Sequence, residues 1–114
     1  ALNQDVLDNA SYFGRIFARS GGLSDAVAQG LKEQNITDFE LKAVACDGIE
    51  ECRTALLKKS KNVLNGNFIE GMACKGGCIG GAGCLTHGEK NKAEVDKYGR
   101  EAYEKSISEA ISIL

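Results

Sequence analysis

Proline is absent from the 114-residue sequence, and neither sign of charge is in marked excess. Because 14 Lys and Arg stand against 16 Asp and Glu, the net charge is −2, which argues against a strongly basic surface for nucleic acid or an anionic membrane. No apolar run approaches the roughly 18–20 residues of a membrane-spanning helix. A charged-then-apolar leader is also absent, which favours the cytoplasm. At 43% hydrophobic and 26% charged residues, the composition predicts one globular domain over residues 1–114.

Cysteine and glycine, by contrast, are concentrated in one short segment. The chain has five cysteines, an odd number that cannot pair completely into disulfides, so reduced or metal-bound thiolates are expected. Between Gly71 and Gly88 lie three of these cysteines, Cys74, Cys78 and Cys84, together with half of the 14 glycines. This segment is therefore where the sequence predicts chemistry.

Hydrophobic spacing predicts two helices in the first third of the chain. The first covers about residues 6–19 and is ended by the pair Gly21–Gly22. The second covers about residues 25–33, with Ser24 as its N-cap and Asn35 as its C-terminal stop.

The middle of the chain predicts a βαβ unit. A strand at 39–45 is followed by a turn at Asp47–Gly48, a helix over 49–63 and a second strand at 67–72. This order implies parallel pairing, and a long polar helix over 91–113 then completes the chain. The expected fold class is α/β, a small parallel sheet with a βαβ unit covered by helices. Two strands make a thin sheet, whose open edge invites self-association.

Both predicted strands bring a cysteine to the same edge of the sheet. Cys46 follows the first strand and Cys74 follows the second, and ligands of open α/β sheets bind at the carboxyl ends of strands. The glycines Gly76 and Gly77 separate Cys74 from Cys78. Glycine lets the backbone take positive φ angles and lets N–H groups approach sulfur. A shared crevice holding these thiols is expected.

Spacing alone leaves two metal centres open. Iron–sulfur clusters are held by thiolates from short cysteine-rich runs, which fits Cys74 and Cys78. Adding Cys84 and His87 gives four ligands, the number required by a closed structural zinc site. A non-catalytic zinc- or metal-binding module built on these four residues is therefore the alternative, and Cys84 is equally open to being a free thiol.

Several of the polar and sulfur-containing residues also have ordinary structural interpretations. Cys52 lies on the apolar face of the predicted third helix and is expected to be a small buried side chain, and packing is the favoured role for Cys46. His87 is expected to be exposed, although its usual pKa suits a proton carrier. For Glu70, a hydrogen bond that holds the loop is favoured over proton transfer.

The segment 68–81, FIEGMACKGGCIGG, resembles the C-terminal signature of the [FeFe] (iron-only) hydrogenases, Met-Ala-Cys-x-Gly-Gly-Cys. The resemblance implies that Cys74 and Cys78 are two of the four cysteine ligands of the active-site [4Fe–4S] cluster. It further implies that Cys78 bridges to the diiron subcluster and that Met72 packs beside it, which makes Met72 and Cys78 the catalytic candidates. Gly76 and Gly77 are the accompanying cofactor-binding candidates.

The resemblance covers only part of the family's pattern. Where better-studied members read Gly-Gly-Gly-Gln-Pro, this chain has Gly81-Ala82-Gly83-Cys84-Leu85. The two earlier motifs with the other cluster cysteines are absent, as are the ferredoxin-like cysteine motifs. The expected protein is thus a C-terminal fragment of a hydrogenase that oxidises H2 and reduces protons reversibly. Its expected partners are the remainder of that hydrogenase chain and a redox partner such as ferredoxin, and the isolated fragment is expected to lack both cluster and activity.

Overall fold

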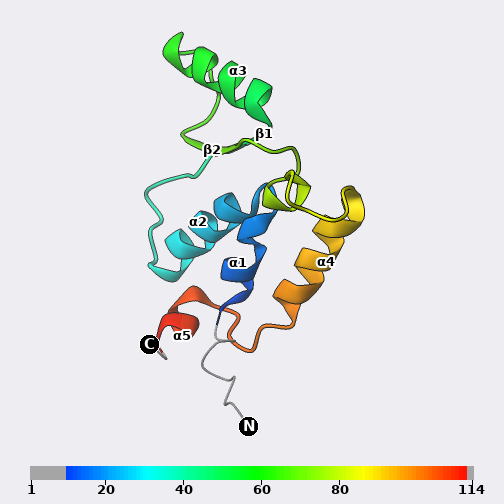
Figure 1. The fold of residues 1–114 in the computed structure, drawn as a ribbon. Coiled ribbons are helices and arrows are strands. Elements are labelled where there is room, and N and C mark those ends of the chain that lie inside the picture. The colour runs from blue at the N-terminus through cyan, green and yellow to red at the C-terminus, as the bar shows by residue number, and fades with distance from the viewer. Residues whose placement is uncertain (1–9, 113–114) are drawn as a thin grey trace.

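A computed structural model describes residues 10–112 of the chain (Figure 1). Its elements follow one another as α1 (Tyr12–Arg15), the 3-10 turn η2 (Ile16–Ala18), α2 (Gly22–Glu33), β1 (Ala43–Asp47), α3 (Ile49–Ser60), β2 (Phe68–Met72), the 3-10 turn η3 (Cys78–Gly80), α4 (Glu89–Arg100) and α5 (Ile107–Ile111). Within this described part, every helix is too short or too polar to cross a membrane.

The sheet confirms the predicted fold class, an α/β arrangement with one βαβ unit. β1 and β2 pair in parallel, from Ala43 opposite Phe68 to Asp47 opposite Met72. α3 packs on the two strands from one side, and α2 packs on them from the other, where α1 and α4 also lie (Figure 1). Because the pairing is parallel, the carboxyl ends of both strands meet at one edge, from which the chain leads to η3 beside α4.

The first strand is shorter at its start than predicted. It begins at Ala43 rather than at residue 39, because the Asn67 side chain occupies the backbone just before it. The Asn67 amide accepts from the Lys42 N–H at 2.7 Å and donates to the Glu40 carbonyl oxygen at 2.7 Å. Asp47, predicted in a turn, is the last residue of β1.

The first predicted helix is confirmed in part. It begins only at Tyr12 and finishes as the 3-10 turn η2, and the part predicted over residues 6–9 lies outside the described residues. Ser11 has an extended backbone and caps α1, because its hydroxyl accepts a 3.2 Å hydrogen bond from the Gly14 N–H. Ser24 does not cap α2, which begins two residues earlier behind Gly21 at φ 87°. Asn35, at φ 57°, does follow the end of α2 as predicted.

The long C-terminal helix was also predicted wrongly, since the structure divides it into α4 and α5. Ser106 caps α5 by accepting from the Glu109 N–H at 3.1 Å. The Glu33 carboxylate, from α2, accepts the N–H groups of Ile107 at 2.8 Å and Ser108 at 2.7 Å. The Glu33 carboxylate thus satisfies the first N–H groups of a new helix and so fixes a turn where a continuous helix was expected.

One closely packed part of the molecule lies among the helices. Ile16 is fully buried, and Ala102 is almost so. Gly99 of α4 sits directly against α1, because a Cβ there would lie 2.8 Å from the Tyr12 ring and 2.9 Å from Ile16. This contact holds α4 beside α1 and places the beginning of α4 near the cysteine-rich segment.

Candidate functional site

The segment from Cys74 to Cys84, called the cysteine loop below, leaves the carboxyl end of β2 and ends shortly before α4. Cys74 lies two residues beyond the last residue of the strand, and Cys78 begins the 3-10 turn η3. The loop therefore lies between the sheet edge and the first turn of α4 (Figure 1).

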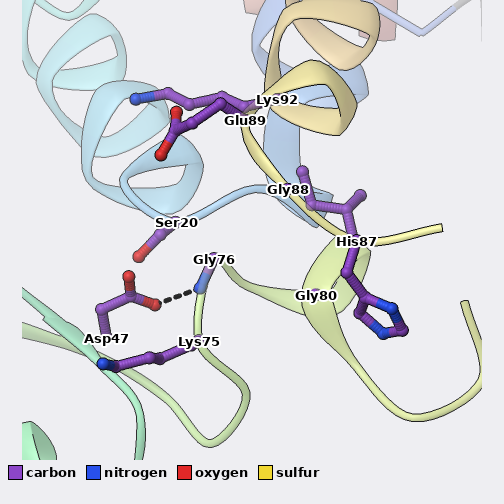
Figure 2. Close-up of a pocket in the computed structure, with 10 residues that line it drawn as sticks. Ser20, Asp47, Lys75, Gly76, Gly80, His87, Gly88, Glu89 and Lys92 are labelled. Atoms are coloured by element: carbon purple, nitrogen blue, oxygen red, sulfur yellow. Dashed lines mark hydrogen bonds between the residues drawn. The ribbon is translucent and has the colours of Figure 1, made fainter.

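The middle of the cysteine loop is held on both sides by backbone hydrogen bonds. The Gly76 N–H donates to the Asp47 carboxylate (Figure 2), and the Gly76 carbonyl accepts from the Ser20 N–H at 3.1 Å. Gly77 forms an antiparallel bridge with Arg19. At φ 89°, with the Ser20 nitrogen 2.7 Å from where a Cβ would stand, position 77 accepts only glycine.

Cys74 and Cys78 are the two exposed residues among the chain's five cysteines. Among the described residues, neither thiol forms a hydrogen bond. The Cys84 thiol, by contrast, donates to the Cys78 carbonyl oxygen at 3.2 Å. The candidate ligands are thus presented to the outside while the backbone between them is fixed.

Cys46 and Cys52 belong to the interior of the βαβ unit. Cys46 lies within β1 and is 2% exposed, and burial, followed by the nearby Cys52 thiol, raises the pKa of its own thiol. It also lines a cavity of about 310 Å³ beside α3. Its burial agrees with packing, the favoured role. Cys52 is half-buried rather than buried, with its sulfur 3.6 Å from the Met72 carbonyl oxygen.

The four residues of the predicted zinc site do not converge. Among residues 10–112, no three His, Cys, Asp or Glu side chains lie close enough together to hold a metal ion. His87 is exposed, as predicted, and its Nε2 hydrogen-bonds the Gly81 carbonyl oxygen at 2.9 Å. The zinc hypothesis therefore finds no support in the geometry.

Glu70 makes hydrogen bonds that hold backbone in place, as predicted, but its partners lie at the start of α2 rather than in the cysteine loop. It is 2% exposed and accepts the N–H groups of Gly21 at 2.6 Å and Ser24 at 3.0 Å. A carboxylate is favourable at this position because the first N–H groups of α2 carry partial positive charge. Glu70 therefore fixes the turn before α2, which in turn carries Ser20 and Arg19 to the cysteine loop.

Sequence reasoning missed the residues that hold the cysteine loop from other elements. Arg19 is buried and donates from Nε to Asp96 at 2.6 Å and from Nη2 to Asp25 at 3.1 Å. Asn91 of α4 donates to the Ile79 carbonyl oxygen at 3.1 Å. Apart from Arg19 and Asp25, which are six positions apart, the paired residues are far apart in the sequence, so no local pattern signals them.

An open cavity of about 490 Å³ lies beside the cysteine loop, between the end of β1 and the start of α4 (Figure 2). Both signs of charge line it, through Asp47, Lys75, Glu89 and Lys92. The imidazole of His87 points away from Asp47 and Lys75 in this view. No group in the cavity is arranged with a second one as an acid–base pair.

The donor set fits half of an iron–sulfur cluster. Thiolates are the soft ligands that these clusters use, and a [4Fe–4S] cluster takes four of them. Cys74 and Cys78 are candidates for two of the four, on either side of Gly76 and Gly77. Within the described residues they form no group of three or more possible ligands.

Comparison of the sequence with known protein families identifies one family that it matches. Residues 2–82 match the family described as the iron only hydrogenase large subunit, C-terminal domain. The match covers well over half of the chain and extends through Cys74 and Cys78, while α4 and α5 lie beyond it. No curated protein matches the chain. Membership implies a hydrogenase, an oxidoreductase with iron–sulfur cofactors in the full-length protein. The chain belongs to the family formed by the C-terminal domain of the large subunit of iron-only hydrogenases.

Proposed function

We propose that this chain is part of the active-site domain of an iron-only hydrogenase that interconverts H2 with protons and electrons. In this role, Cys74 and Cys78 supply two of the four cysteine ligands of the active-site [4Fe–4S] cluster. When bound, the cluster and its diiron subcluster supply the electron transfer and the H2 chemistry. The residues of the chain bind and orient that group.

The observation that carries the proposal is a pair of exposed cysteines on a fixed backbone, whose thiols form no hydrogen bond with any residue that the structure describes. A structural cysteine is usually buried, as Cys46 is, whereas a ligand must be accessible before its metal arrives. Binding a cluster requires both thiols to lose their protons, so the affinity falls as the pH is lowered. Gly76 and Gly77 fix the path of the chain between the two sulfurs through their bonds to Asp47, Ser20 and Arg19.

Met72 and Cys78 are proposed to face the diiron subcluster, on the strength of the family resemblance. Met72 ends β2, and its carbonyl oxygen accepts from the Gly48 N–H at 2.8 Å. The residue is therefore anchored by its backbone at the sheet edge from which the cysteine loop departs. A thioether is an adaptable, polarisable neighbour for such a group.

Two ligands do not complete a cluster, so the proposal requires partners. The remainder of the hydrogenase chain supplies the other two cysteines, and a redox protein such as ferredoxin exchanges electrons with the assembled site. The isolated chain binds no stable cluster and does not turn over H2. Five unpaired thiols are typical of a reducing compartment, which favours the cytoplasm.

The test replaces single cysteines by alanine in the intact hydrogenase that contains this chain. We expect Cys74→Ala and Cys78→Ala to lose the active-site iron and nearly all H2 uptake with an artificial electron acceptor. Cys84→Ala is the matched control, because it removes a thiol from the same loop without removing a proposed ligand. Iron, acid-labile sulfide and H2 uptake are measured on each protein.

Two results would contradict the proposal. One is wild-type iron content and H2 uptake in Cys74→Ala or Cys78→Ala. The other is stoichiometric zinc without iron in the freshly purified protein. H2 turnover by the chain alone would separately overturn the statement that it is inactive by itself.

A further inference from the structure

Helix α4 lies beyond the matched residues 2–82, yet it reaches the cysteine loop by two routes. In the first route, the Asp96 carboxylate accepts a 2.6 Å hydrogen bond from Nε of Arg19. In the second, the Asn91 side-chain amide donates to the Ile79 carbonyl oxygen, 3.1 Å away. Ile79 directly follows Cys78, so both routes end next to a proposed ligand.

The main chain of Arg19 lies directly against the peptide between the two cysteines. Arg19 and Gly77 form an antiparallel bridge, and a Cβ at position 77 would stand 2.9 Å from the Arg19 carbonyl carbon. Because this is a contact of backbone with backbone, neither partner yields by rotating a side chain. Displacing Arg19 therefore displaces Gly77, and with it the spacing of Cys74 and Cys78.

The Arg19 side chain is in turn anchored by two helices and by the neighbouring backbone. The side chain is 10% exposed, and its guanidinium bonds Asp96 of α4 at 2.6 Å, Asp25 of α2 at 3.1 Å and the Ser20 carbonyl oxygen at 3.2 Å. Burial by itself lowers the pKa of the guanidinium, but the hydrogen bonds and charges of Asp96 and Asp25 outweigh burial and raise it. Asp96 is the better shielded partner, with 24% of its side chain exposed against 51% for Asp25.

A planar guanidinium suits this place better than an ammonium would. Its fork of N–H groups reaches two carboxylates and a carbonyl oxygen at once, whereas a lysine is a point charge on a flexible stem. A buried ion pair contributes little net stability, because desolvation offsets the attraction. Its main effect is to fix the position of the backbone that carries it.

We propose that Arg19, held by Asp96 of α4, is a positioning residue that sets the spacing of the two cluster thiolates. This inference rests on the proposed function of Cys74 and Cys78. It gives α4, which the family match does not include, a part in building the metal site. Groups that orient metal ligands in this way are commonly worth about 10-fold or more in metal affinity.

The experiment compares Asp96→Asn and Arg19→Lys with the wild type in the intact hydrogenase. Each protein is reconstituted with limiting iron and sulfide, and its cluster is examined by electron paramagnetic resonance and by redox titration. We expect both variants to lose about tenfold in iron affinity and to show a shifted spectrum and reduction potential in the folded, loaded fraction. Asp25→Asn removes the same charge from a more exposed position and is expected to have a smaller effect.

Gly66→Ala is the control for stability alone. It crowds Val44 and the Lys42 carbonyl oxygen at the amino ends of the strands and removes no bond to Arg19. At a matched loss of melting temperature, it should keep the wild-type spectrum and potential in its loaded fraction. The same spectral shift in Gly66→Ala as in Asp96→Asn would overturn the inference, as would a wild-type spectrum and iron affinity in Asp96→Asn and Arg19→Lys.

The cysteine variants separate this inference from the proposed function. If Cys74→Ala and Cys78→Ala retain the cluster, the proposed ligation fails and Arg19 has no ligand to position. If those two variants lose it while Asp96→Asn and Arg19→Lys bind and titrate like the wild type, only the positioning role fails.

Discussion

The α3 side of the sheet and the cysteine-loop side distribute polar and apolar groups in opposite ways. On α3, Ile49 is 68% exposed and Leu56 is 61% exposed, whereas beside the loop the charged residues Arg19 and Glu70 are 8% and 2% exposed. Burying a charge is costly unless every bond is made, and here both groups are bonded. The comparison indicates that the buried charges determine where the loop backbone lies, while the apolar area of α3 adds little to the stability of this chain.

On the cysteine-loop side, the largest loss of stability is expected from Gly77→Ala. The new Cβ meets backbone atoms of the 19–20 segment at 2.7–2.9 Å, and the residue must keep φ at 89°. Crowding and strain together should lower the free energy of unfolding of the chain by about 4 kcal/mol, measured by urea denaturation. Gly83→Ala, which meets nothing within 4 Å, should change it by less than about 0.5 kcal/mol. Equal losses in the two variants would show that the loop is not held at Gly77.

Glu70→Ala tests the buried carboxylate on the same side. It leaves the N–H groups of Gly21 and Ser24 without their acceptor, which should cost about 3 kcal/mol of unfolding free energy. The exposed Glu94 of α4 provides a control, because Glu94→Ala removes a carboxylate without a buried partner. A Glu70→Ala protein as stable as Glu94→Ala would mean that the carboxylate does not fix this turn.

The cysteines offer a chemical comparison of the two regions. Burial raises the pKa of the Cys46 thiol, whereas Cys74 and Cys78 are exposed. Alkylation by iodoacetamide at pH 7.5, followed by peptide mass spectrometry, should therefore be at least about tenfold slower at Cys46, equivalent to about 1.4 kcal/mol. Denaturing the chain in urea should abolish the difference. Comparable rates in the native chain would mean that β1 opens readily.

The smallest effect concerns Glu33, which links α2 to α5. Hydrogen bonds from Ser108 and Ile107 lower the pKa of this carboxyl from 4.5 to about 2. Because the folded-state pKa is the lower one, the stabilisation is present above about pH 4.5 and is lost as the pH falls through about 2. Amide exchange at Ile107 and Ser108, corrected for intrinsic rates, should lose protection over this range. In Glu33→Gln the protection should be weaker and independent of pH; an unchanged profile would rule out this role.

Local patterns in the sequence were sufficient for part of the fold. The helix after β1 and the second strand were predicted closely, because alternating and three-to-four spacing are properties of neighbouring residues. The start of β1 was missed because Asn67 binds the backbone at Lys42 from 25 positions away. The division between α4 and α5 was missed because Glu33 binds it from 74 positions away.

In the candidate site, too, the sequence did not predict contacts between residues that are far apart along the chain. Cys74 and Cys78 stand out by residue type and spacing, whereas Arg19 and Asp96 carry no signal that links them. Glu70 was expected to make a hydrogen bond, but its partners in the turn before α2 became visible only in the folded chain.

The order of helices and strands and the paired thiols beside glycine were set by the sequence alone, because each depends on a few adjacent residues. Only the tertiary structure decided which residues hold the cysteine loop in place and which helices carry them. Hydrogen bonds and ion pairs join groups that are close in space but distant along the chain, and such pairs leave no periodic trace in the order of residues.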